Sequence, residues 1–267
     1  MTSDRITTFL EEFFIFGLKQ ARACIFAGSF FVILFLSHHI SLFGLPRYDF
    51  LFFAAVLIQI LLVLTKIETM DELKTIFLFH IIGLALEIFK THPSIGSWSY
   101  PEFGYFKIMN VPLYSGFMYA AVGSYIAQAW RLFKLHLVDA PTWRLSGGVG
   151  VLIYLNFFTH HFIPDFRYLL MLVILILFRR TWVEFVVIRE KRRMPLALSF
   201  VLIGFFIWVA ENISTFLGAW KYPEQIVTWT TVSFHKVGSW SLLVIISFIL
   251  VAYLKTVNEA RPSRVID

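Results

Sequence analysis

The sequence has 267 residues, of which 58% are hydrophobic, 18% aromatic and only 15% charged. Soluble domains carry about 25% charged and about 45–50% apolar residues, so this composition excludes an ordinary soluble enzyme and predicts a membrane protein. The net charge of +6 arises from basic residues placed between apolar runs, which indicates orientation in a membrane and not a nucleic-acid partner. The single cysteine, Cys24, excludes an intramolecular disulfide and a thiol-rich metal site.

The apolar runs along the chain are close to the about 17–25 residues that cross a bilayer as a helix. Residues 5–20 mix charges with aromatic residues and predict an interfacial helix, not a signal peptide. Eight spans follow, at residues 24–43, 48–65, 75–91, 111–130, 146–163, 167–188, 194–214 and 236–254. Arg179 and Arg180 interrupt the sixth span. This helix is therefore expected either to cross the membrane as a short span or to end at these two arginines. The predicted fold class is all-α, a polytopic transmembrane helical bundle.

The Lys and Arg residues are distributed unevenly between the two sides of these spans. With the N-terminus placed inside, 17 of the 23 basic residues lie on the inner side and 6 on the outer side. Basic residues collect on the cytoplasmic side of membrane proteins. Both termini are therefore expected in the cytoplasm, and the first, third, fifth and seventh spans run outward.

A five-residue pattern, Trp-x-Tyr-Pro-Glu, occurs twice, at residues 98–102 and 220–224. Each copy follows the pattern Glu-x-x-x-Thr, at residues 87–91 and 211–215. The second glutamate lies 124 residues after the first. One such match carries little weight, but a second motif repeats at nearly the same distance.

That second motif is a histidine doublet, His38-His39 and His160-His161, repeated after 122 residues. Two motifs at similar offsets predict a tandem duplication of a four-span unit. An even number of spans gives both units the same orientation, related by a pseudo-twofold axis along the membrane normal. The expected parts are a cytoplasmic segment (1–23), the first repeat (24–130), a cytoplasmic loop (131–145), the second repeat (146–254) and a cytoplasmic tail (255–267).

The predicted topology gathers ionisable side chains near the outer face. Glu87 and Glu211 lie in apolar helices, where an ionised carboxylate is costly and a functional role is expected, as a general acid or base or as a proton carrier. The histidines of this face are His38, His39, His92, His160, His161 and His235. Histidines with carboxylates and no thiols suit zinc, iron, copper or manganese, although the spacing of a recognised metal motif such as H-E-x-x-H is absent.

Each of these residues also has a structural interpretation. Histidines at a membrane interface can simply reach toward the headgroups, and the glutamates can cap helix ends. Trp98, Tyr100, Trp220 and Tyr222 either form an aromatic belt or line a substrate or cofactor pocket, where aromatic faces stabilise a carbocation-like state.

The stretches ENISTFLGAWKYPEQ and VSFHKVGSW, with the repeated Glu and Trp-x-Tyr-Pro-Glu motifs, resemble the YoaT-like family of bacterial integral membrane proteins. That resemblance implies the bacterial inner (plasma) membrane. More loosely, the glutamate followed by Trp-x-Tyr and Val111-Pro112-Leu113 is similar to membrane carotenoid hydratases and integral-membrane lycopene or terpene cyclases. Those families imply acid chemistry on an isoprenoid, with Glu87 and Glu211 as the acids.

Together these features predict a membrane-embedded enzyme with one outward-facing His/Glu site. Its substrate would be lipid-like, with an isoprenoid as one candidate, and its chemistry would be acid–base or metal-assisted. The alternatives are a proton- or metal-coupled transporter, because parallel repeats with intramembrane acids also describe carriers, and a haem protein, because paired histidines on helices supply axial ligands.

Overall fold

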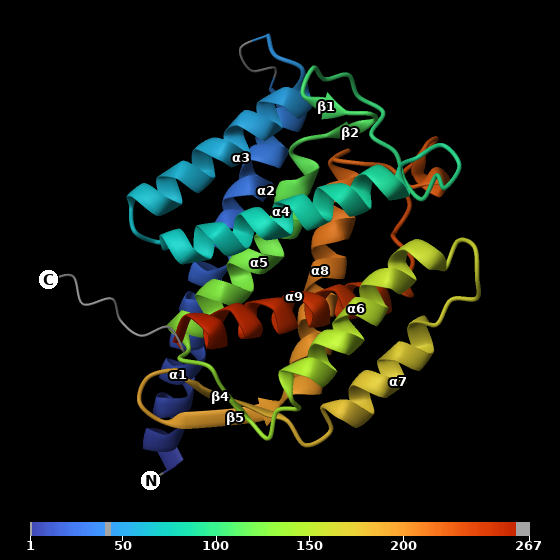
Figure 1. Cartoon of the computed structure of the whole chain (residues 1–267). Coiled ribbons are helices and arrows are strands. Elements are labelled where there is room, and N and C mark those ends of the chain that lie inside the picture. The colour runs from blue at the N-terminus through green and yellow to red at the C-terminus, as the bar shows by residue number, and fades with distance from the viewer. Residues whose placement is uncertain (1, 41–43, 260–267) are drawn as a thin grey trace, which may run out of the picture.

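The computed structural model describes residues 2–40 and 44–259, with side-chain surroundings for residues 8–40 and 44–255. Residues 41–43 of the first predicted span and 260–267 of the predicted tail lie outside this part. In chain order the elements are α1 (Thr2–Ala23), α2 (Ile25–His39), α3 (Arg47–Leu64), α4 (Met70–Lys90), β1 (Lys107–Ile108), β2 (Val111–Pro112), α5 (Ser115–Leu132), β3 (His136–Val138), α6 (Trp143–Thr159), α7 (Arg167–Leu177), β4 (Trp182–Val186), β5 (Lys191–Pro195), α8 (Leu196–Phe216), a 3₁₀ helix (Pro223–Gln225) and α9 (Lys236–Glu259). The predicted helical fold is confirmed, with short strands added (Figure 1).

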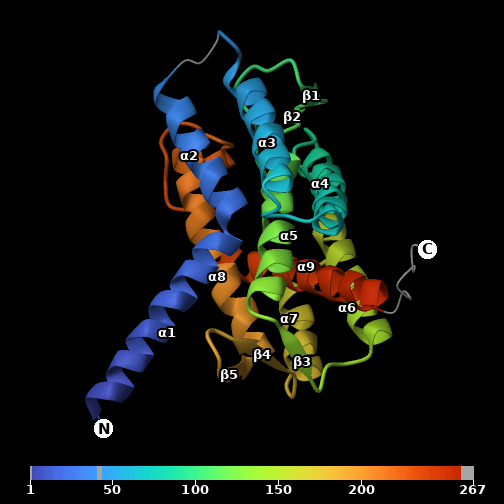
Figure 2. The same cartoon turned by 90° about the vertical axis from the view of Figure 1, so that its left-hand side faces the viewer.

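The first two helices form one bent unit. α1 and α2 meet at an angle of 66° around Cys24, and α1 runs obliquely away from the bundle in Figure 2. Lys19 links α1 to the ends of α5 and β4, because its Nζ donates to the carbonyl oxygens of Leu132 at 3.0 Å and Val186 at 3.2 Å. A helix before the first span was predicted, and it is longer than the predicted 5–20.

The number of membrane spans differs from the sequence prediction. Three helices, α3, α8 and α9, are long and apolar enough to cross a membrane, and the bent α1–α2 pair makes a fourth if it counts as one span. Every predicted span contains a helix, but α4 carries several charges, α5 is rich in small and polar residues, and α6 and α7 have only 17 and 11 residues. The apolar helices indicate membrane association, whereas eight spans are not supported.

The sixth predicted span, 167–188, is the clearest correction. α7 ends at Leu177, and the chain continues into the antiparallel hairpin β4–β5. Valine and aromatic residues in β4 favour a strand, and Arg179 and Arg180 lie in the turn that separates this strand from the helix. β3, within the predicted 131–145 loop, pairs with β4 in the order β3-β4-β5, at the lower end of Figure 1.

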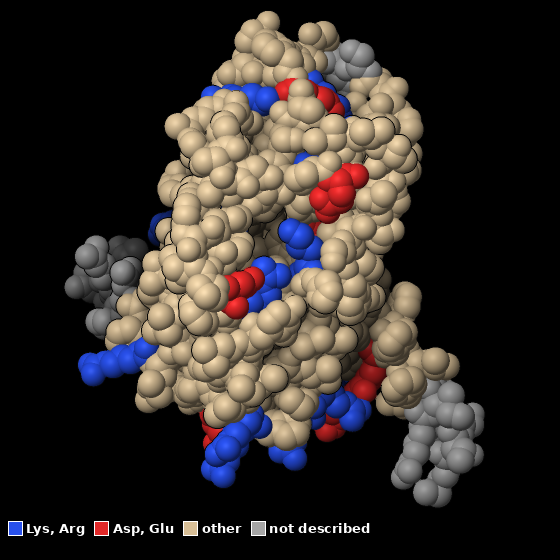
Figure 3. Space-filling view, turned by 90° about the vertical axis from the view of Figure 1, so that its right-hand side faces the viewer, with Lys and Arg blue, Asp and Glu red and all other residues tan. Residues whose placement is uncertain are grey.

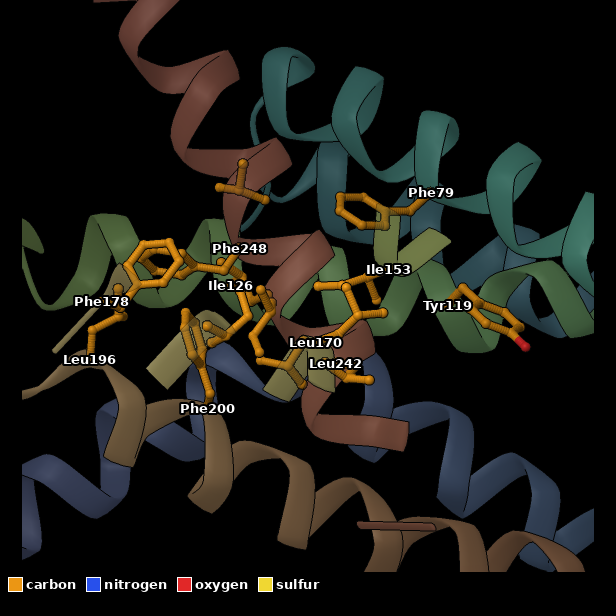
Figure 4. Close-up of a cluster of buried hydrophobic side chains, with 14 of the residues drawn as sticks. Phe79, Tyr119, Ile126, Ile153, Leu170, Phe178, Leu196, Phe200, Leu242 and Phe248 are labelled. Atoms are coloured by element: carbon orange, nitrogen blue, oxygen red, sulfur yellow. The ribbon is translucent and has the colours of Figure 1, made fainter. Parts of the chain in front are cut away.

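Two large hydrophobic clusters and a small one around Ala23, Ala129 and Phe133 lie in the part of the chain that the structure describes. One joins α4, α5, α6, α7, α8 and α9, with Phe79, Ile153, Phe200 and Phe248 interleaved (Figure 4). The other joins α2 and α3 with the loops that follow α4 and α8. α4 packs mainly on α5 and α8 mainly on α9, so the helices that carry the two glutamates lie next to helices that also contribute to the site.

Candidate active site

The two Trp-x-Tyr-Pro-Glu segments lie side by side. The backbone N–H of Ser99 donates to the carbonyl oxygen of Lys221 at 2.9 Å, and the N–H of Lys221 donates to the carbonyl oxygen of Ser99 at 3.0 Å. Each residue is second in its own copy of the motif, so equivalent positions pair with each other. The rings of Trp98 and Tyr222 also meet edge to face, with 6.1 Å between centroids. Segments far apart in the sequence thus form one structural unit.

Glu87 lies near the end of α4 and is 2% exposed. Its Oε2 accepts hydrogen bonds from the indole Nε1 of Trp98 and the hydroxyl of Tyr100, both at 2.7 Å. Its Oε1 accepts from the hydroxyl of Tyr119 in α5 at 2.8 Å. Burial, aided by the adjacent carboxylate, raises the pKa of Tyr100 well above its ordinary value, so this hydroxyl stays protonated and donates.

Glu211 has a similar but not identical set of donors and is also 2% exposed. Its Oε1 accepts from the hydroxyl of Tyr222, and its Oε2 accepts from the indole Nε1 of Trp240 in α9 at 2.6 Å. Burial, with the nearby carboxylate, raises the pKa of Tyr222 well above its ordinary value. Trp220 is buried, but the indole donor in this half comes from α9.

Indole and phenol groups surround both carboxylates. Within the described residues neither Glu87 nor Glu211 forms an ion pair. The donors are neutral, so binding or release of a proton breaks no salt bridge. A carboxyl group held in this way can serve as a general acid or base if a substrate reaches it.

A cleft with an apolar lining lies next to this cluster, between α4, α5, α6 and α9. Its lining includes Phe79, Leu86, Tyr119, Tyr154, Leu243 and Ile246. Tyr119 faces the cleft and also donates to Glu87. The free volume is about 20 Å³, which is room for about one water molecule.

Arg47, the first residue of α3, forms hydrogen bonds with both of the loops that carry the Trp-x-Tyr-Pro-Glu motifs. Its guanidinium donates to Glu102 at 2.7 Å, to the carbonyl oxygen of Leu217 at 2.6 Å and to that of Gly218 at 3.2 Å. Glu102 ends the first motif, and Leu217 and Gly218 form the turn after α8. Gly218 has φ of +71°, which glycine adopts without strain. One side chain therefore ties the two motif-bearing loops together.

The second histidine doublet lies against Lys90 at the end of α4. Nζ of Lys90 is 2.8 Å from Nε2 of His161 and 3.3 Å from Nε2 of His160. Nδ1 of His160 is 2.8 Å from the carbonyl oxygen of Asn156, so Nδ1 carries the proton and Nε2 accepts from the ammonium. Burial, then the charge of Lys90, lowers the pKa of His161 to about 4. Burial also lowers the pKa of His160.

The other predicted histidines lie apart from this doublet. His38 and His39 are exposed at the end of α2, His92 is exposed with its Nδ1 2.8 Å from Oγ of Ser94, and His235 is exposed before α9. Among residues 2–40 and 44–259, no three His, Cys, Asp or Glu side chains are placed to hold a metal ion. The six histidines predicted as ligands are therefore not brought to one centre.

Three residues of the site escaped the sequence analysis: Tyr119, Trp240 and Lys90. A weak signal existed for the first two, because Tyr119 and Trp240 are 121 residues apart, close to the spacing of the other repeated motifs. Lys90 stands inside the first Glu-x-x-x-Thr pattern, where its charge near a helix end looked like an ordinary interfacial residue.

The comparisons with known proteins cover this entire site. A family model described as "Protein of unknown function (DUF817)" matches residues 12–248. The chain is similar to "Uncharacterized protein YoaT" of Bacillus subtilis (strain 168), with 54% identity over 255 residues and 96% of each chain covered. No solved structure matches the chain. The predicted resemblance to the YoaT-like family is confirmed.

Proposed function

The chain belongs to the DUF817 family, and we propose that it is a membrane-embedded enzyme that performs acid–base chemistry on a lipid-like substrate. Glu87 and Glu211 exchange the protons. The hydrocarbon part of the substrate would enter between α4, α5, α6 and α9, and these helices must move apart to admit it, because the cavity between them has a volume of only about 20 Å³. Trp98, Tyr100 and Tyr222 hold the two carboxyl groups in place.

The position of Tyr119 is the observation that carries this proposal. Its ring faces the apolar cleft, and its hydroxyl donates to Glu87. In the proposed reaction Glu87, in its protonated form, gives its proton to the substrate, and the carboxylate left behind is stabilised by the hydrogen bonds from Trp98, Tyr100 and Tyr119. Positioned general acids and bases contribute about 10²–10⁴-fold to a rate.

The proposal includes two related units of four helices, α2–α5 and α6–α9, that share one site. The reciprocal hydrogen bonds between Ser99 and Lys221 support this, because equivalent positions pair in this way across a twofold axis. The corresponding donors Tyr119 and Trp240, from the last helix of each unit, support it as well. In the expected orientation both termini are cytoplasmic and the site lies near the outer face of the membrane.

The test follows lipid conversion by the purified protein. Protein in nanodiscs is incubated with total lipid extract from bacterial membranes, and the lipids are compared by mass spectrometry before and after. Wild type is expected to deplete one lipid and form one product, while Glu87→Gln and Tyr119→Phe slow this by at least about 10²-fold, the range for lost acid–base catalysis. Glu190→Gln, an exposed residue of the β4–β5 turn, is the matched control. Conversion at the wild-type rate by Glu87→Gln and Glu211→Gln would refute the assignment.

A proton-coupled carrier is the second candidate. The observation that favours it is that both buried carboxylates hold only neutral donors and can change charge without losing an ion pair. A carrier predicts proton movement in liposomes under a solute gradient, read with an internal pH dye, and no change in lipid composition. Lipid conversion without such proton movement favours the enzyme.

A further inference from the structure

Three basic side chains lie near Glu87 and Glu211. Lys90 ends α4, Arg167 begins α7 and Lys236 begins α9. Lys90 lies 3.3 Å from Nε2 of His160, Asn156 one turn earlier donates to Asp165 at 3.0 Å, and Asp165 pairs with Arg167 at 2.9 Å. The ammonium of Lys236 lies 4.4 Å from the centre of the Tyr222 ring. Figure 3 shows this side of the molecule, where Lys or Arg and Asp or Glu side chains border a hollow.

Lys90 has an unusual environment for a lysine. It is 5% exposed, and its Nζ reaches two imidazole nitrogens, those of His160 and His161. Both imidazoles are neutral acceptors, so they satisfy hydrogen bonds and supply no negative charge. Among the described residues no carboxylate lies within ion-pair distance of Lys90. A buried ammonium without a counter-charge is costly.

The surrounding charges do not balance it. Asp165 lies nearby, but its carboxylate pairs with Arg167 at 2.9 Å. Glu211 and Glu224 act on Lys236 from the other side. The N-terminus of α9 adds further partial positive charge at Lys236. Burial, then the positive charges of Lys236 and Arg167, lowers the pKa of Lys90 to about 7, so its ammonium form lacks a compensating negative charge, which an incoming anion would supply.

We propose that Lys90, Arg167 and Lys236 bind an anionic group, a phosphate or a carboxylate. This inference rests on the proposed function and identifies its substrate as an anionic lipid. The headgroup is held by the three basic side chains, and the chain extends from them toward Tyr154. Tyr154 is on α6, less than two turns before the histidines that contact Lys90. Arginine forks and lysine ammonium groups are the usual partners of phosphate and carboxylate.

Thermal stability in detergent tests the proposal, with three probes added in separate titrations. These are dihexanoyl phosphatidic acid, dihexanoyl phosphatidylcholine and inorganic phosphate. Dihexanoyl phosphatidic acid is expected to raise the melting temperature of wild type, and Lys90→Met and Lys236→Met are expected to weaken its apparent affinity at least tenfold. Lys74→Met, which removes an equal charge from an exposed lysine at the start of α4, keeps the wild-type response.

A response to inorganic phosphate alone, equal to that of dihexanoyl phosphatidic acid, supports the anion site and identifies a soluble ligand in place of a lipid. No response to either anion, or an equal response in Lys90→Met and wild type, overturns the proposal. If Lys90→Met does not fold, Lys236→Met decides in the same way. The enzyme proposal fails separately: Glu87→Gln that retains both anion binding and turnover refutes the acid–base role and leaves the anion site intact.

Discussion

Replacement of Gly83 by alanine tests how closely α4 and α5 must approach to hold the site. A Cβ at Gly83 would lie 2.4 Å from Cγ of Tyr119, whereas ordinary contacts begin at 3.4 Å. The tyrosine ring must therefore move by roughly 1 Å, and its hydroxyl leaves the 2.8 Å position at Glu87. Overpacking of this kind costs about 1–3 kcal/mol. The lost hydrogen bond to a charged group costs about 1.5–3 kcal/mol, and the higher helix propensity of alanine returns about 1 kcal/mol.

The expected net loss of stability is about 1.5–5 kcal/mol, and each kcal/mol lowers the melting temperature by about 2–4 °C in a chain of this size. Thermal unfolding followed by intrinsic tryptophan fluorescence measures it. Gly148→Ala is the matched control, because its Cβ would meet nothing within 4 Å and the propensity gain of about 1 kcal/mol remains. Equal stabilisation by both substitutions would show that α4 and α5 are not in close contact at Gly83, and the account of how Tyr119 is positioned would be wrong.

Two further predictions use the same melting assay. Glu68 is 1% exposed and accepts hydrogen bonds from three neutral side chains of α3 and α5. Glu68→Ala is expected to lower the free energy of unfolding by about 3 kcal/mol, because these three partners are left unsatisfied. Lys74→Ala removes an exposed ion pair with Asp71 and should lower the free energy of unfolding by less than about 1 kcal/mol. Similar losses of stability in Glu68→Ala and Lys74→Ala would contradict the importance assigned to the buried Glu68. Because burial and Lys90 lower the pKa of His161 from 6.5 to about 4, its neutral form stabilises the fold above pH 6.5, and this contribution is lost as pH falls toward 4. In His161→Gln the melting temperature should fall less between pH 6.5 and pH 4 than it does in wild type. The same pH dependence of the melting temperature in both proteins would contradict this assignment.

The glutamates and the repeated loops were predictable because their chemistry is local in the sequence. A carboxylate inside an apolar run is costly enough to be noticed without any fold. The Trp and Tyr donors of Glu87 follow it after one tight turn, within one motif. Ser99 and Lys221 occupy the same position in the two copies of the motif, but only the folded structure shows that they pair with each other.

Other parts of the site depend on contacts between distant helices. Tyr119 and Trp240 are aromatic residues among many in this chain, and only the approach of α5 to α4 and of α9 to α8 selects them. Lys90 meets His160 and His161 only because α6 ends beside α4. The histidine repeat was a real feature of the sequence, yet the two doublets have different surroundings, one exposed and one bonded to an ammonium.

The eight predicted spans are not supported, and one reason is that an apolar run does not distinguish burial in protein from burial in lipid. α7 is apolar throughout but ends after 11 residues, where valine-rich β4 begins a hairpin. α4 and α5 bury carboxylate, hydroxyl and amide groups against each other. For helices of this kind the apolar pattern reports the protein interior as much as the membrane.

The two halves of the site are related but not interchangeable. Glu87 accepts three hydrogen bonds, two of them from its own motif, whereas Glu211 accepts two, and its indole donor comes from α9. Glu211 also interacts with Lys236, a charge that has no counterpart among the bonds of Glu87. Only Glu87 is joined through Tyr119 to the cleft. If the protein is the proposed enzyme, these differences assign proton transfer at the substrate to Glu87 and leave Glu211 beside Lys236.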